Sequence, residues 1–251
     1  MSALYLEAGW TAHPAIRALT TWRRHPDLPG HSQGDWAGLN LGEHVGDDPA
    51  AVAANRADLQ RVAGLPEAPR WLNQVHGTAV AYLPSAEAST RADAAWTDQP
   101  DVVCAILTAD CLPVFVADRQ GRAVGLAHAG WRGLAEGVIE ATLAAMDRPA
   151  TELQAWLGPA IGLEAFQVGD EVRAAFLDRH AGDEPCFRAD GPGHWRADLQ
   201  RLARHRLQRA GVADVSAAAG CTFSQPQRFY SHRRSAPCGR MASLIWIEGS
   251  A

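Results

Sequence analysis

The strongest hydrophobic pattern of the chain lies near its middle. Residues 102–107 form an apolar run with several β-branched members, too short for an isolated helix and followed by Thr-Ala-Asp, so they predict a buried strand. Residues 113–117 and 123–127 predict two further strands, joined by the turn sequence Asp-Arg-Gln-Gly. The pattern therefore predicts a hairpin directly after Cys111, and then a helix over 134–146.

A second clear pattern predicts a helix that begins after Asp48 and ends at Gly64. Asp48 suits the N-cap, Pro49 is favoured in the first turn, and apolar residues recur at helical spacing between them and Gly64. The long loop before this helix is rich in Gly and Pro but carries anchors such as Trp36 and Leu41. Such anchors predict an ordered loop.

The remaining segments predict an irregular alternation of strands and helices. Further strands are predicted over 4–24 (a strand and its exit), 69–75, 78–83, 153–157, 212–219 and 241–247, and further helices over 169–180 and 195–210. No repeat or linker divides the chain. We therefore predict an α/β fold with a mixed sheet and α+β character, forming a single compact layered domain over residues 1–251.

The composition excludes several classes of enzyme, because the chain contains no lysine and all 23 of its Lys and Arg residues are arginine. Schiff-base chemistry, pyridoxal-phosphate enzymes and the phosphate-binding GK[ST] loop all require a lysine. A phosphate or carboxylate ligand must therefore be held by arginine or by backbone N–H groups.

Cysteine content and charge favour a cytoplasmic protein. The five cysteines are odd in number and show no C-x-x-C spacing, which argues against a disulfide framework and against a zinc ribbon. The N-terminal residues have neither a basic start nor a continuous apolar core, so no secretory signal or membrane span is predicted. The formal net charge is −5 with scattered arginines, and therefore we expect neither nucleic acid nor membrane as a partner.

Three ionisable residues lie at the ends of predicted strands: His76, Cys111 and His128. Two imidazoles and a thiolate supply three protein ligands for zinc and leave a fourth position for water, the pattern typical of catalytic zinc. The same residues also suit a Cys–His nucleophile site. Their separations of 35 and 17 residues match no local metal motif, so ordinary core or surface positions are a third interpretation. The residues alone leave all three open.

Two common motifs do not predict a function here. Residues 30–34 match G-x-S-x-G, but proline and glycine precede the serine and glycine follows it. The nucleophile elbow of serine hydrolases requires a strand before the serine and a helix after it, so we interpret the match as coincidental. No G-x-G-x-x-G follows a predicted strand, and a dinucleotide fingerprint is therefore absent.

Other arginines and tryptophans are candidates for ligand contacts, each with an ordinary surface or core alternative. The candidate anion-binding residues are Arg56, Arg132, Arg233, Arg234 and Arg240, and the candidates for stacking on a heterocycle are Trp22, Trp36 and Trp131.

Several longer motifs span nearly the whole chain. They are GLNLGEHVGDD (38–48), NQVHG (73–77), LTADCLPV (107–114), AHAGWRGL (127–134), LGPAIG (157–162), FQVGDEV (166–172) and GRMASLIWI (239–247). Together they resemble the YfiH family, also called the laccase-domain or polyphenol-oxidase-like family. The resemblance implies a single-domain α/β fold and one zinc ion held by His76, Cys111 and His128.

The resemblance also implies an activity on purine nucleosides. The expected reaction is phosphorolysis of adenosine, inosine, guanosine and methylthioadenosine to base and pentose 1-phosphate, with adenosine deamination alongside. Copper is less expected than zinc, because three ligands without Met or a further His cluster do not make a multicopper site. Two alternatives stay open: a hydrolase that removes wrongly incorporated serine from a peptidoglycan precursor, and a non-enzymatic metal-binding protein.

The resemblance also suggests catalytic residues. It places the helix carrying Arg56 beside the site, so Arg56 is predicted to bind phosphate, whereas Asn40 and Asp110 are candidates to hydrogen-bond the sugar or base. The chain departs from the family pattern at residues 29–32, where a G-G-[VA]-S run is typical, and at 236–238. These departures put substrate choice in doubt. The expected partners are purine nucleosides and phosphate, and the chain is expected to be a monomer.

Overall fold

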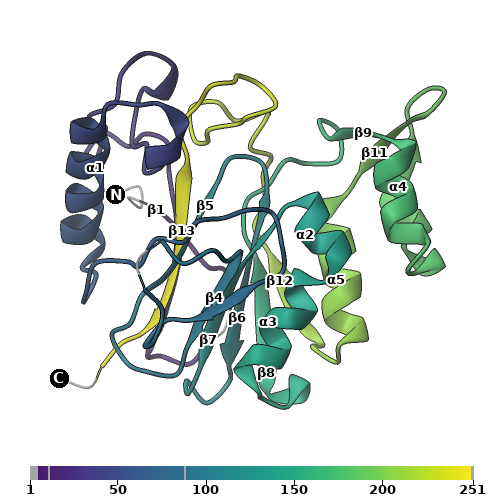
Figure 1. Cartoon of the computed structure of the whole chain (residues 1–251), viewed down its shortest axis with the longest axis horizontal. Helices are drawn as coiled ribbons and strands as arrows, with labels where there is room; N and C mark the ends of the chain where they lie inside the picture. Colours follow the sequence, from purple (N-terminus) through teal and green to yellow (C-terminus); the bar gives the residue numbers. More distant parts are fainter. Residues whose placement is uncertain (1–4, 11, 88, 250–251) are drawn as a thin grey trace.

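The structure is a computed structural model that describes residues 5–10, 12–87 and 89–249. Its strands form three sheets, two of them large (Figure 1). One has the order β1 (Tyr5–Glu7), β2 (Ile16–Thr21), β13 (Met241–Ile247), β5 (Cys104–Thr108). The six-stranded sheet has the order β12 (Asp214–Ala217), β8 (Leu153–Leu157), β6 (Leu112–Asp118), β7 (Val124–Ala129), β4 (Ala94–Thr97), β3 (Val80–Tyr82). The smallest sheet has the order β10 (Phe187–Ala189), β11 (His194–Ala197), β9 (Gln167–Gly169).

The helices flank these sheets. They are α1 (Pro49–Ala63), α2 (Trp131–Glu136), α3 (Val138–Met146), α4 (Asp170–Leu177) and α5 (Leu199–Arg209), with 3₁₀ turns η1 (Gly34–Trp36), η2 (Glu43–Val45), η3 (Ala150–Glu152) and η4 (Ala181–Cys186). The six-stranded sheet contains the parallel pairs β12–β8 and β3–β4 among antiparallel ones. The predicted mixed α/β fold is confirmed.

The two large sheets stack face to face, and helices cover their outer faces. Figure 1 shows α1 beside the four-stranded sheet and α2, α3 and α5 on the far side of the six-stranded sheet. Strand β6 explains the order of these layers. Val114 and Val116 belong to the cluster packed against the helices, whereas Phe115 and Ala117 alternate with them and face the other sheet. A strand covered on both faces is apolar throughout, as the central sequence pattern is.

Several predicted elements agree with the structure. The hairpin after Cys111 is formed by β6 and β7, and β8 and β13 have the predicted bounds. Helix α1 begins at Pro49, and the Asp48 carboxylate accepts a hydrogen bond from the Ala50 N–H at 2.9 Å. Within the described residues, no helix is both long and apolar enough to cross a membrane.

Replacing Asp48 by alanine is expected to lower the free energy of unfolding by about 1 kcal/mol, because the first turn of α1 loses its N-cap acceptor. Urea denaturation followed by circular dichroism measures the change. Asp48→Asn keeps an acceptor oxygen and should lie close to the wild type. Equal destabilisation by the two substitutions would contradict the capping role.

Other predicted elements differ from the structure in kind, in bounds or in continuity. Residues 69–75 form no strand, and the helix predicted over 134–146 starts earlier and divides into α2 and α3 at Gly137, whose φ is +105°. The helix predicted over 195–210 begins only at Leu199, because Asp198 caps it and the preceding residues form β11. The single strand predicted over 4–24 is two antiparallel strands, β1 and β2, in the structure, and residues 4 and 11 lie outside the described residues.

Candidate metal centre and substrate cleft

Cys111 and His128 are brought together by the β6–β7 hairpin. Cys111 lies in the short turn between β5 and β6, directly before Leu112, and Leu112 pairs with Ala129. His128 lies one residue earlier on β7, opposite Pro113. The end of the hairpin therefore presents a thiol and an imidazole at the same edge of the six-stranded sheet.

His76 reaches the same edge from a loop and not from a strand end, contrary to the prediction. Its backbone has a φ of +62°, and its side-chain Nε2 lies 3.9 Å from Cys111 Sγ. The rings of His76 and His128 meet edge to face with their centroids 4.8 Å apart. The ligand atoms of His76, Cys111 and His128, called the trio below, all lie within 4.8 Å of one another.

Asp93 holds the trio together, although nothing in the sequence pattern singled it out. Its fully buried carboxylate accepts backbone hydrogen bonds from Val75, His76 and Gly77 at 3.1, 2.8 and 2.7 Å, which fixes the loop of His76. The same carboxylate lies 2.9 Å from His128 Nδ1. A carboxylate behind a histidine orients the ring and leaves the other nitrogen free for a metal, as in many zinc sites.

The charges of the trio and Asp93 are strongly coupled. Burial alone would raise the pKa of Cys111, but His128 and His76 beside the sulfur lower it to about 6. Burial would lower the pKa of His128, but Cys111 and Asp93 raise it. For Asp93, burial is likewise outweighed by hydrogen bonds from His128 and from the Gly77 and Val75 amides, so its pKa lies below the ordinary value. The site thus favours a thiolate at neutral pH, the form that binds metal.

Because Gly130 has no side chain, there is room beside it for the side chains of Cys111 and His76. A Cβ atom at this position would lie 3.0 Å from Cys111 Sγ and 3.0 Å from His76 Cδ2. The glycine of the H-A-G-W-R-G motif is therefore required by close approach, since a side chain here would displace two of the three candidate ligands.

A cavity of about 330 Å³ opens beside the trio. Besides the trio it is lined by His44, Gln74, Leu107, Thr108, Ala109, His232 and Arg240. His44, Gln74 and Leu107 also line a neighbouring cavity of about 320 Å³ that contains Arg56 and Trp71. The two cavities share these walls, and we call them together the cleft. Each lies within the range of about 300–1,000 Å³ usual for small-molecule sites.

The cleft contains two arginines, Arg56 and Arg240, and the carboxylate of Glu43. Burial, followed by the positive charges of Arg240 and Arg56, lowers the pKa of His44, so this imidazole is neutral at neutral pH. Arg56 forms an ion pair with Glu43 at 2.6 Å and donates to the Leu41 carbonyl. Its guanidinium also lies over the Trp71 ring, 4.3 Å from the centroid. Two guanidiniums around a neutral imidazole favour an anionic ligand.

Asn40 and Asp110, two of the predicted catalytic residues, do not line the cleft. Asn40 is fully buried, and its side-chain oxygen accepts the Arg240 N–H at 2.9 Å. The Asp110 carboxylate accepts hydrogen bonds from Thr222, Ser231 and the Arg233 N–H, at 2.6, 2.9 and 2.7 Å. Both side chains are engaged with protein partners next to residues of the cleft.

The other predicted arginines and tryptophans are distributed elsewhere. Arg132 and Trp131 line a separate groove between α2 and α4, and Arg234 donates to the carbonyls of Thr222, Phe223 and Phe229. The Trp36 indole donates to Val45 O. Trp71, which the sequence interpretation passed over, is the tryptophan that lines the cleft. Its position in the wrongly predicted strand gave no sign of this.

Ser32, the serine of the G-x-S-x-G match, is not placed as a nucleophile. It is buried, its hydroxyl donates to Asp47 at 2.6 Å, and Asn55 donates to it at 2.9 Å. No histidine base contacts it in these bonds, which agrees with the interpretation of the motif as coincidental.

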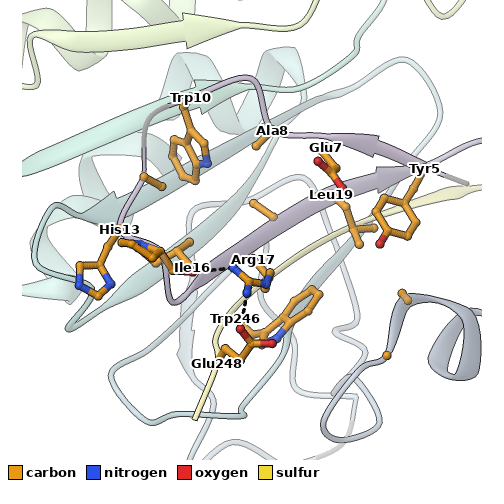
Figure 2. A pocket seen from close by; sticks show the side chains of 15 residues that line it. Tyr5, Glu7, Ala8, Trp10, His13, Ile16, Arg17, Leu19, Trp246 and Glu248 are labelled. Atoms are coloured by element: carbon orange, nitrogen blue, oxygen red, sulfur yellow. Dashed lines mark hydrogen bonds and ion pairs between the residues drawn. The ribbon is translucent and has the colours of Figure 1, made fainter. Parts of the chain in front are cut away.

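A larger cavity of about 580 Å³ lies against the N-terminal segment (Figure 2). Its lining includes Trp10, His13 and Trp246, and Figure 2 shows Arg17 directed to Glu248, with which it forms an ion pair. Among the described residues that line this cavity, His13 is the one histidine and none is a cysteine. It therefore lacks the group of possible metal ligands that lies at the cleft.

Known proteins resemble this chain over nearly its whole length. A purine nucleoside phosphorylase of Pseudomonas aeruginosa is 48% identical over 245 residues, covering 97% of this chain and 98% of the relative. The purine nucleoside phosphorylase YfiH of Escherichia coli is 43% identical over 239 residues, covering 95% and 96%.

Solved structures give the same result. A Neisseria meningitidis protein superposes with a TM-score of 0.92 at 45% identity, covering 98% of this chain and 100% of that one. YlmD from Geobacillus stearothermophilus gives 0.86 at 28% identity, covering 99% and 98%. The family described as multi-copper polyphenol oxidoreductase laccase matches residues 18–248. The motifs, the fold and these matches agree, and the chain belongs to this YfiH-like laccase-domain family.

Proposed function

We propose that the protein is a zinc-dependent purine nucleoside phosphorylase that also deaminates adenosine. The observation that carries this proposal is the cleft, where a His–Cys–His trio lies beside two arginines and a neutral histidine. Relatives that cover almost the whole chain are named purine nucleoside phosphorylases, which supports a phosphorylase-type enzyme using purine nucleosides and phosphate. The proposed nucleosides are adenosine, inosine, guanosine and methylthioadenosine.

The trio fits zinc better than a multicopper centre. Two imidazole nitrogens and one thiolate are zinc ligands, and three protein ligands leave a position open to a substrate or water. A bound zinc ion would supply Lewis acidity toward an atom placed at that position. Asp93 would hold His128 in the tautomer that directs Nε2 to the ion.

The arginines of the cleft would bind phosphate. Arg240 lies in the same cavity as the trio, and Arg56 lies in the adjoining one. Glu43 exposes 65% of its side chain, so its ion pair with Arg56 can open for a phosphate oxygen without leaving a buried charge unpaired. Held in this way, the phosphate would be placed for attack on the ribose C1′ atom.

The departing purine must gain a proton as the bond from C1′ to its nitrogen breaks. His44 and His232 are the two further imidazoles that line the cavity of the trio. Because the pKa of His44 is lowered and its ring is neutral, His232 is the candidate proton donor, and His44 can accept a hydrogen bond from the substrate. Deamination would use the same cleft: water, in place of phosphate, would add to C6 of adenine, and the bond from C6 to the amino nitrogen would break to release ammonia.

Asn40 and Asp110 would act by positioning. Asn40 holds the backbone of Arg240, and Asp110 anchors the turn directly before Cys111 to the 222–233 loop. Asp110 also adopts a φ of +87°, a conformation that costs energy in a residue with a side chain and that its three hydrogen bonds offset.

Arg240→Ala is expected to raise the KM for phosphate about tenfold or more, because a hydrogen bond to a charged group contributes about 1.5–3 kcal/mol. Steady-state kinetics with varied phosphate and saturating inosine measures the change. Arg132→Ala, in the separate groove, is the matched control and should leave this KM unchanged. Equal effects of the two substitutions would remove Arg240 from the phosphate site.

The proposal as a whole is tested by incubating zinc-replete protein with adenosine, with and without phosphate. Adenine and ribose 1-phosphate are expected only with phosphate, and inosine in both samples. No product from zinc-replete protein would overturn the proposal. Release of serine from a serine-substituted peptidoglycan precursor, with no nucleoside cleaved, would replace it by the editing function.

A further inference from the structure

A second group of metal-type donors lies where η4 packs against α5. Asp183 and Cys186 are three residues apart in η4, and residues at this spacing lie on one face of a 3₁₀ helix. His205 and Arg209 are four residues apart on α5 and also share a face. The Asp198 N–H donates to the Cys186 carbonyl at 2.9 Å, which fixes the two elements together.

The donor atoms of this group converge. Asp183 Oδ1 lies 3.0 Å and Cys186 Sγ 3.6 Å from His205 Nδ1, and all three ligand atoms lie within 4.8 Å of one another. Zn–S bonds of about 2.3 Å and Zn–N bonds of about 2.0 Å at tetrahedral angles separate sulfur and nitrogen by roughly 3.5 Å. The S–N separation therefore already suits an ion, and the N–O separation needs to open only by a few tenths of an ångström.

The surroundings leave one side accessible. Asp183 and Cys186 are 0% and 1% exposed, whereas the His205 side chain is 25% exposed. The Asp183 carboxylate and the Cys186 thiol therefore lie on the interior side of the group, and solvent can reach it from the side of the His205 imidazole. Among the residues that the structure describes, the trio is the other group of His, Cys and acidic side chains with its ligand atoms this close.

We propose that Asp183, Cys186 and His205 form a second site for a thiolate-binding divalent cation such as zinc, with water at the fourth position. Burial and the neighbouring Asp183 raise the pKa of the Cys186 thiol to about 12, so the thiol gives up its proton to solvent only as the ion binds. The contact between His205 Nδ1 and Asp183 then opens, and His205 keeps its proton on Nε2 so that the Nδ1 lone pair faces the ion. The ion links η4 to α5. The site shares no residue with the trio and does not depend on the proposed enzymatic activity.

Arg209 sets the strength of this site. Its guanidinium binds both oxygens of Asp183, at 2.8 and 3.1 Å, and so offsets the charge of the carboxylate. At the trio, the corresponding carboxylate is that of Asp93, and its hydrogen bonds come from His128 and from backbone N–H groups, not from an arginine. The ion at the second site therefore meets less negative charge, and a chelator should remove it before the ion at the trio.

Cadmium titration of the metal-free full-length protein tests the proposal, because each cadmium–thiolate bond adds an ultraviolet charge-transfer band. In Cys111→Ala, which removes the thiolate of the trio, one equivalent of cadmium is still expected to produce the band. Adding Cys186→Ser should abolish it, whereas adding Cys221→Ser, a partly exposed cysteine outside both groups, should preserve it. His205→Ala should weaken cadmium binding about tenfold or more.

Circular dichroism confirms that each variant is folded, and His205→Ala provides a second route if Cys186→Ser is not. The proposal is overturned if Cys111→Ala shows no thiolate band, if the band survives Cys186→Ser, or if unchanged affinity in His205→Ala shows that the imidazole is no ligand. Nucleoside cleavage plays no part in the readout, so failure here and failure of the proposed function are distinguishable.

Discussion

Cys111→Ala is expected to lose nearly all zinc at the trio and roughly 100-fold or more of the phosphorolysis rate. Changing residues behind a metal ligand typically costs about 10–100-fold, and Cys111 is itself a candidate ligand. Its sulfur is the one anionic donor of the trio, beside two imidazoles that lower its pKa to about 6. Removing it leaves two neutral donors, which hold zinc weakly at neutral pH.

The measurement is zinc per chain by elemental analysis, with phosphorolysis of inosine assayed on the same samples. Both measurements use protein that also carries Cys186→Ser, so that the proposed second site formed by Asp183, Cys186 and His205 contributes no metal. Cys221→Ser in that background is the control and should keep zinc and activity. Equal zinc in the Cys111→Ala variant and its parent would eliminate the thiolate as a ligand.

Asp93→Ala is expected to lower zinc affinity about 10–100-fold and to destabilise the fold by about 3–5 kcal/mol. Four groups lose their acceptor at once: the amides of Val75, His76 and Gly77, and the His128 ring. The loop of His76 then has no fixed position relative to the hairpin. Asp93→Asn keeps one acceptor oxygen and should fall between the wild type and Asp93→Ala in both measurements.

The effect on stability has a defined pH dependence. The folded-state pKa of Asp93 is lowered, so its stabilising contribution is complete above the unfolded value of about 3.9 and disappears as the pH falls through the folded value. Chemical denaturation of metal-free wild type and Asp93→Asn at several pH values measures this. The difference in unfolding free energy should shrink in acid, and a constant difference would show that the carboxylate charge contributes nothing.

The parts of the fold that local sequence determines were predictable. Helix α1 has its N-cap, its proline and its terminal glycine within the same short stretch, and the β6–β7 hairpin has its turn residues between two apolar runs. The break at Gly137 was not predicted, because apolar residues continue across it and only the observed φ of +105° separates α2 from α3. Residues 69–75 are apolar enough for a strand, but a side chain and not strand pairing attaches this segment to β5. The Gln74 amide donates a hydrogen bond to the Leu107 carbonyl and accepts one from the Leu107 N–H.

The site was predictable in its chemistry and not in its assembly. The motifs around His76, Cys111 and His128 suggested three candidate ligands, and the structure brings these side chains together. Asp93 was missed because it lies 35 residues from His128 in sequence, and its contact depends on the pairing of β4 with β7. His44 and Arg240 reach the cleft from opposite ends of the chain, a proximity that spacing cannot reveal.

The short turn that contains Cys111 leaves one large sheet and enters the other, since β5 pairs with β13 whereas β6 pairs with β7. The two ends of the cleft are therefore mounted on different layers: His128 and Cys111 belong to the hairpin of one, and Arg240 directly precedes β13 of the other. Phe115 and Trp156 belong to the apolar cluster that fills the space between these two layers. Substitutions in that cluster are therefore expected to change the spacing of the two layers, and with it the shape of the cleft, without altering any residue that lines the cleft.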